Sequence, residues 1–117
     1  MVKLDNETGS ICISNDVFTW LAGDAATRCF GVKGMCALSK ENGLVQMLRR
    51  ESMSKGVAVS ANDDGSISIE LHIAVDHGVN LSTLAGSIQN EVAYKVSSAT
   101  KVPVRRVDVY IDSMTLN

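Results

Sequence analysis

Residues 66–76, SISIELHIAVD, carry the pattern that most restricts the fold of this chain. Apolar residues alternate there with polar or small ones: Ile67, Ile69, Leu71, Ile73 and Val75 against Ser68, Glu70, His72, Ala74 and Asp76. A period of two predicts a strand with one buried and one solvent-facing side. A sheet that is wet on one face is typically antiparallel or mixed. The preceding GVAVSA (56–61) and the Asp64-Gly65 turn predict a hairpin.

The next stretch switches to a helical period. Its apolar stripe, spaced by three and four residues, predicts an amphipathic helix to about Thr100: Leu81, Leu84, Ala85, Ile88, Val92 and Val96. Asn80 or Ser82 can cap its start. Pro103 excludes helix and begins a last strand, in which Val107, Val109 and Ile111 alternate with Arg106, Asp108, Tyr110 and Asp112.

The first half is less regular. Residues 9–14 predict a short strand, and Ser14, Asn15 or Asp16 can cap a helix over 17–30 that ends at Gly31. Residues 32–38 are predicted to be extended, and LVQMLRR (44–50) to form a short helix. We expect a flexible N-terminus at 1–8 and a variable, mobile segment at 38–55.

These elements predict a single domain over 1–117 of the α+β class. The order is strand, helix, strand, strand, strand, helix, strand, with the short 44–50 helix inserted after the second strand. Since each long helix and several strands have one apolar face, the economical packing has two layers. A mixed sheet then carries both long helices on one face.

Composition narrows the function. The 117 residues are 45% hydrophobic and 21% charged, as in ordinary soluble domains, with a net charge of −2. That charge argues against a general binder of polyanions. The polar N-terminus lacks the apolar stretch of a secretion signal, and we expect a cytoplasmic protein without a transmembrane segment. The odd set of Cys12, Cys29 and Cys36 signals neither disulfides nor zinc, and predicts buried thiols.

Two histidines raise candidate sites. Adjacent strand residues point to opposite faces, so Asp76 and His77 are a weak catalytic pair, and the alternative is a strand end at Gly78. His72 and His77 are five apart, which places them on opposite faces of a strand, and no third metal ligand has a supportive spacing. We therefore expect no catalytic residue, no metal and no cofactor.

GVKG (31–34) matches the GxxG loop that clamps nucleic acid in KH domains, although there it joins two helices. Its glycines Gly31 and Gly34 are alternatively turn residues, like Gly65, Gly78 and Asn80. Several basic residues form either a patch or a solvated set: Arg49, Arg50, Lys55, Lys101, Arg105 and Arg106. Trp20 falls off the apolar stripe of its helix, which marks either a contact surface or partial burial at the flank.

Longer stretches resemble a known family: ISNDVFTWLAGDAATRCFGVKGM, SKGVAVSA, ISIELHIAVDHGVNL and VPVRRVDVYID. Their order and spacing over residues 9–113 are similar to those of the bacterial alkaline-shock-protein family, also called the envelope stress response family. The chain departs from the family pattern at Arg28, where an acidic residue is common, and at His77, where an aromatic residue often precedes the glycine.

The resemblance implies a non-enzymatic cytoplasmic scaffold or adaptor, linked to envelope homeostasis in Gram-positive bacteria. It implies self-association and a place at the membrane through a separate membrane-anchored protein. We expect its contacts at Trp20, Arg49, Arg50, Glu70, His72, Arg106, Asp108 and Tyr110. The alternative is a small nucleic-acid-binding module that uses the GxxG turn.

Overall fold

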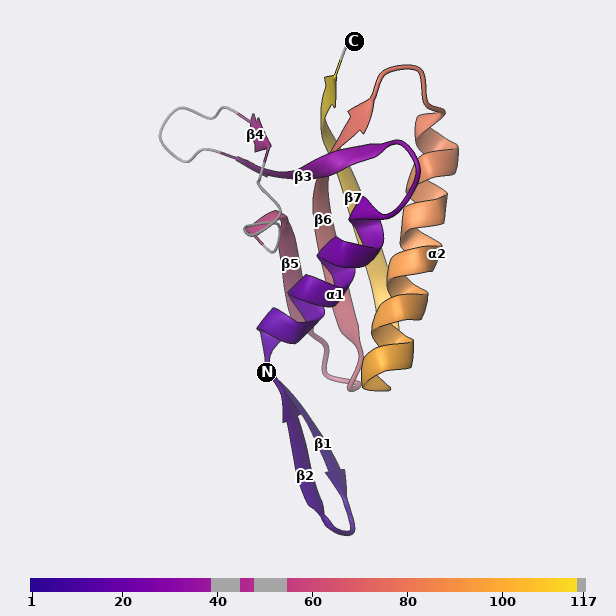
Figure 1. Ribbon diagram of the computed structural model, residues 1–117. Helices are drawn as coiled ribbons and strands as arrows, with labels where there is room; N and C mark the ends of the chain where they lie inside the picture. Colours follow the sequence, from indigo (N-terminus) through magenta and orange to yellow (C-terminus); the bar gives the residue numbers. More distant parts are fainter. Residues whose placement is uncertain (39–44, 48–54, 116–117) are drawn as a thin grey trace.

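The computed structural model describes residues 1–38, 45–47 and 55–115 (Figure 1). The elements are β1 (Val2–Asn6), β2 (Gly9–Ile13), α1 (Asn15–Thr27), β3 (Val32–Leu38), β4 (Val45–Met47), β5 (Val57–Ala61), β6 (Ile67–Asp76), α2 (Leu81–Thr100) and β7 (Val104–Thr115). The predicted α+β sandwich is confirmed, because both helices cover the same face of the sheet in Figure 1.

Strand β6 is the centre of the sheet. Along one edge it pairs antiparallel with β5 through its first half and with β3 through its second half. Along the other edge it pairs with β7 in parallel, from Ile67 to Asp76. Strand β4 extends the sheet beyond β3, which gives five strands among the described residues. The sheet is therefore mixed, as the alternation predicted.

The core lies between this sheet and the two helices. The inward side chains of β6 are almost completely buried, and α2 packs onto them with Leu84, Ile88, Val92 and Val96. Helix α1 adds Phe18 and a set of alanines, whose small side chains let its backbone approach the sheet closely. The apolar stripe predicted for α2 is thus the face that packs from Leu84 onward, whereas Leu81 at its start is exposed.

Side-chain oxygens that accept backbone hydrogen bonds mark where both helices begin. The Ser14 hydroxyl accepts from the backbone N–H of Asp16 at the start of α1. The Asn80 side chain accepts from the N–H of Thr83 at 3.0 Å at the start of α2. The sequence offered each of these residues among two or three caps. Gly31 is not the cap of α1, because the helix ends at Thr27 with Arg28 as its C-cap.

Two segments differ from the sequence-based expectation. Residues 45–47 form a strand, so the helix predicted over 44–50 is wrong, and pairing with β3 determines their conformation. Its remaining positions, and most of 38–55, lie outside the described residues. Residues 1–8, expected to be flexible, provide the first strand of a hairpin with β2, which projects from the body in Figure 1. Val2 at its base is buried against the core, which anchors it.

Side-chain burial gives two further corrections. Ala74 was expected on the wet side of β6 but is buried, because it lies between Gly34 of β3 and Ser113 of β7. Of the three cysteines, Cys36 is buried and Cys29 is half-buried, but Cys12 is exposed on the projecting hairpin. The prediction of three buried thiols is therefore wrong at Cys12.

Gly56 lies where β3 and β5 converge on β6. A Cβ atom there would stand 2.8 Å from the backbone oxygen of Cys36 and 3.3 Å from that of His72. Backbone oxygens inside a sheet cannot move aside without breaking the sheet's hydrogen bonds. The junction of the three strands therefore requires glycine at this position.

We predict that Gly56→Ala lowers the free energy of unfolding by about 1–3 kcal/mol, the usual cost of forcing an extra methyl into a packed site. The matched control is Gly86→Ala in α2, where an added Cβ meets no atom within 4 Å. That change should stabilise by about 0.5–1 kcal/mol, because alanine favours helix. Urea denaturation followed by circular dichroism measures both, and equal effects would contradict the close approach.

Candidate functional site

The side of the sheet opposite the helices carries a continuous set of polar side chains from β6 and β7. We call this set the outer face: Ser68, Glu70, His72, Arg106, Asp108, Tyr110 and Asp112. The parallel register places Glu70 beside Asp108 and His72 beside Tyr110. Five of the expected contact residues are thereby brought together on adjacent strands.

His72 is held at the centre of the outer face by two carboxylates and a ring. Its Nδ1 lies 2.7 Å from Asp112 Oδ2, and its Nε2 lies 3.1 Å from Glu70 Oε2. Its imidazole stacks on the Tyr110 ring with centroids 4.8 Å apart and planes 11° from parallel. Since contacts on both nitrogens and one ring face fix the imidazole, the four side chains form one rigid cluster.

The charge of His72 decides how well this cluster is satisfied. Partial burial lowers the pKa of the imidazole, but hydrogen bonds and negative charge from Glu70 and Asp112 together outweigh it and raise the pKa above its ordinary value. A protonated imidazole donates from both nitrogens, whereas a neutral one donates from a single nitrogen. Loss of the proton therefore leaves one carboxylate without its donor.

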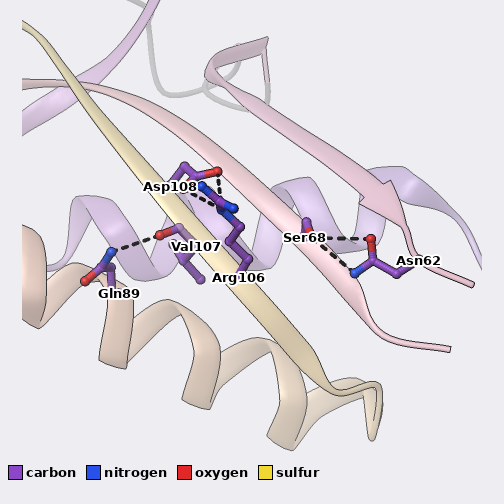
Figure 2. A network of polar contacts seen from close by, with 6 residues as sticks. All are labelled: Asn62, Ser68, Gln89, Arg106, Val107 and Asp108. Carbon is purple, nitrogen blue, oxygen red and sulfur yellow. Dashed lines mark hydrogen bonds and ion pairs between the residues drawn. The ribbon is translucent and has the colours of Figure 1, made fainter. Parts of the chain in front are cut away.

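Other polar pairs continue the outer face toward the start of the two strands (Figure 2). The Arg106 guanidinium donates to both carboxylate oxygens of Asp108, at 2.9 and 3.0 Å. The Asn62 side chain, in the turn between β5 and β6, donates to the hydroxyl of Ser68 at 3.1 Å. At the edge of β7 that faces away from β6, Gln89 of α2 donates to the backbone oxygen of Val107 at 3.0 Å. The Arg106 side chain stays 71% exposed, so it can also reach a partner.

The remaining sequence candidates are dispersed. Trp20 lies on α1, in the helix layer, and is 45% exposed. Arg49 and Arg50 lie outside the described residues. Asp76 ends β6 and pairs with Lys33 at 3.7 Å rather than with His77. Gly78, with a φ of 94°, makes the turn that follows, so the stretch is a strand end.

GVKG is not in the setting of a nucleic-acid clamp. It joins α1 to β3 instead of two helices, and Gly34 already belongs to β3 beside a register shift. The basic side chains of β7 act on carboxylates, because Arg106 pairs with Asp108 and the charge of Arg105 helps to lower the pKa of Asp64 after hydrogen bonds from Ser66. Lys55 and Lys101 are exposed elsewhere.

The structure also shows a feature that sequence reasoning missed. Phe30 is 95% exposed at the rim of a cavity of about 410 Å³ between the end of α1 and the start of α2. Leu84, Thr83, Ser87 and Glu91 of α2 line its other side. The only available signal was the position of Phe30 after the last helical turn, which places an aromatic residue in a loop.

Fold and surface thus define a small α+β domain whose recognisable feature is a polar sheet face. Residues 3–116 match the model of the alkaline shock protein 23 family, described as having a cell envelope-related function, and the chain belongs to that family. No helix among the described residues is long and apolar enough to cross a membrane.

Relatives cover nearly the whole chain. It is 33% identical to the uncharacterized protein YloU of Bacillus subtilis over 97% of this chain and 94% of the relative. It is 34% identical to the uncharacterized protein Spy1614 of Streptococcus pyogenes, over 97% and 93%. It is 28% identical to the uncharacterized protein YqhY of Bacillus subtilis, over 95% and 83%. No solved structure matches the chain.

We predict that Asp112→Asn lowers the pKa of His72, because the variant removes one of the two negative charges that favour the imidazolium. An NMR titration of the His72 ring protons in wild type and variant measures this change. Glu70→Gln should shift the pKa in the same direction. A His72 pKa that is unchanged in both variants would contradict the cluster.

The same cluster makes a prediction about stability. Because folding raises the pKa of His72, its contribution to stability is fully present below the unfolded-state pKa, and it is lost as pH rises through the folded-state pKa. The stability difference between wild type and His72→Gln should therefore shrink as the solution becomes alkaline. Denaturant unfolding on both sides of the titration checks the sign, and a difference that grows with pH would be the opposite of the expected result.

Proposed function

We propose that this protein is a non-enzymatic adaptor or scaffold in cell-envelope homeostasis, which acts by binding other proteins through its outer face. The observation that carries the proposal is the chemistry of that face. It combines the fixed His72 and Tyr110 rings, the exposed Arg106 guanidinium, and the carboxylates of Glu70, Asp108 and Asp112.

Such a surface suits protein recognition. Tyrosine and arginine are enriched among the residues that dominate binding energy at protein interfaces. Tyr110 is 45% exposed, and its stacking on His72 holds the ring in place before binding. A ring that is already fixed loses less conformational entropy when a partner covers it. The adjoining carboxylates would repel phosphate groups, which supports a protein partner over a nucleic acid.

The envelope link rests on the family's described function. We place the protein in the cytoplasm, at the membrane through a membrane-anchored partner, and we include self-association among its contacts. In this proposal the protein has no catalytic residue and no cofactor. Trp20 on α1, at the same exposed fraction as Tyr110, would provide a second contact in the helix layer.

The test is co-purification from the native host of partners bound to tagged wild type and single variants. We predict that Tyr110→Ala reduces recovery of envelope proteins about tenfold or more, as expected when an aromatic anchor is truncated. Tyr94→Ala is the matched control, because Tyr94 is an exposed tyrosine on α2. It should leave recovery unchanged.

Trp20→Ala separates the two layers. If partners are lost with Tyr110→Ala alone, the binding surface is the outer face. If they are lost with Trp20→Ala alone, the binding surface is in the helix layer instead. Recovery of nucleic acid that resists moderate salt would replace the proposal with the nucleic-acid alternative. Turnover of a metabolite that depends on His72 or His77 would refute the non-enzymatic part.

A further inference from the structure

The outer edge of β7 is not paired with any other strand among the described residues, although Gln89 of α2 donates to its Val107 oxygen. Strand β7 runs over twelve residues and pairs only with β6 among the described strands. An edge strand presents a row of backbone N–H and C=O groups that can pair with another chain. Whether this edge is adapted for pairing depends on which residues point outward.

The backbone geometry identifies those residues. Gln89 reaches the oxygen of Val107 from the side of β7 that faces away from β6, as Figure 2 shows. In a parallel ladder the backbone groups of successive residues alternate between the two edges. Val109 and Ile111 therefore also direct their N–H and C=O groups outward. Register shifts at Ile67/Ser68 and Ile73/Ala74 bound the regular stretch from Arg106 to Ile111. Val109 is the middle one of the three outward residues within it.

From this symmetry we infer that β7 pairs antiparallel with β7 of a second copy of this chain about a two-fold axis at Val109. The inference deepens the self-association included in the proposed function, and it rests on that part of it. In this register Val109 pairs with its own copy and Val107 pairs with Ile111. It is the register that engages all three outward residues in both copies.

The side chains agree with the same register. On the outer face Arg106 lies opposite Asp112 of the second copy, and Asp108 lies opposite Tyr110. Opposite charges facing each other across strands stabilise pairing, whereas like charges destabilise it. A shift of two residues about the axis sets Asp108 against itself or Asp108 against Asp112. Charge complementarity therefore favours the register that the backbone already selects.

The contacts within one copy allow this arrangement. The Arg106 side chain is 71% exposed and can reorient, and Asp112 contacts His72 through Oδ2, while a carboxylate can accept from further donors. Gln89 would release the Val107 oxygen, which then accepts from the N–H of Ile111 in the second copy. The residues spaced by four from Gln89 on the same side of α2 are small: Ala85, Ala93 and Ser97.

Charged side chains and bulges on an edge strand more commonly prevent association. If the charges and bulges of β7 prevent association, the purified full-length protein stays monomeric. If β7 pairs with a second copy, the protein dimerises. Because a strand pair buries less surface than the roughly 1,200 Å² of stable complexes, we expect a weak, reversible dimer. Sedimentation equilibrium over a micromolar to millimolar concentration series is the measurement.

The decisive experiment exchanges charges between copies. Arg106→Glu makes both facing positions negative, and Asp112→Arg makes both positive, so each variant alone should dimerise at least about tenfold more weakly than wild type. An equimolar mixture should regain association, because the glutamate introduced in one variant then faces the arginine introduced in the other. The β7–β7 pairing contains two such facing positions, and the other one in the mixed dimer keeps its original pair of Arg106 and Asp112. Lys95→Glu, an exposed charge on α2, is the control and should dimerise as wild type does.

A second pair of variants tests the backbone. Proline is tolerated on an edge strand where its nitrogen faces outward, so Val109→Pro should preserve the fold but weaken dimerisation about tenfold or more. Val109→Thr keeps the N–H and the branched shape, and it should dimerise normally. Circular dichroism confirms that every variant is folded before its association is compared.

A wild type that remains monomeric at millimolar concentration overturns the inference, as does association that Val109→Pro leaves intact in a folded protein. The inference is also overturned if wild type associates but the equimolar mixture of Arg106→Glu and Asp112→Arg does not regain association, because the interface then lies outside β7. These results are distinguishable from failure of the adaptor proposal. Dimerisation is measured on the purified protein alone, whereas outer-face binding is measured by recovery of other proteins with Tyr110→Ala.

Discussion

Burial of the inner face of β6 is the interaction on which the rest of the structure depends. Ile67, Ile69, Leu71, Ile73 and Val75 are each at most 1% exposed, and both helices pack over the sheet that they anchor. Full burial of one such side chain contributes about 1.5–3 kcal/mol, so this row is a large part of the driving force. Because side chains alternate along a strand, burying these five also determines which residues form the outer face.

The regular helices and strands could be predicted from the sequence better than the pairing between them. Five alternations identified β6, the spacing of the apolar stripe identified α2, and Pro103 marked the start of β7, since these patterns follow directly from element geometry. LVQMLRR was mistaken for a helix because a short apolar run fits either period, and its contact with β3 decided the outcome. Residues 2–6 are too short and too polar for a clear period, and their hairpin with β2 was missed.

The outer face was predictable only in part. Alternation correctly placed Glu70, His72, Arg106, Asp108 and Tyr110 on wet strand faces. The contact of His72 with Asp112 joins positions forty residues apart, and it requires the parallel register of β6 and β7. No local pattern encodes that register, so neither the clamped imidazole nor the direction of its pKa shift could be derived beforehand. Phe30 and its cavity were missed for a similar reason, since they depend on how two helix ends meet.

The parallel pairing of β6 and β7 also has a consequence for how the protein is made. Strand β6 is followed by α2 before its parallel neighbour appears, because a parallel connection needs a crossover. A chain that emerges from the ribosome therefore exposes one whole edge of its central strand until residues 104–115 have been synthesised. During that interval the exposed edge of β6 is open to mispairing with other chains, and only the last strand to be synthesised closes it.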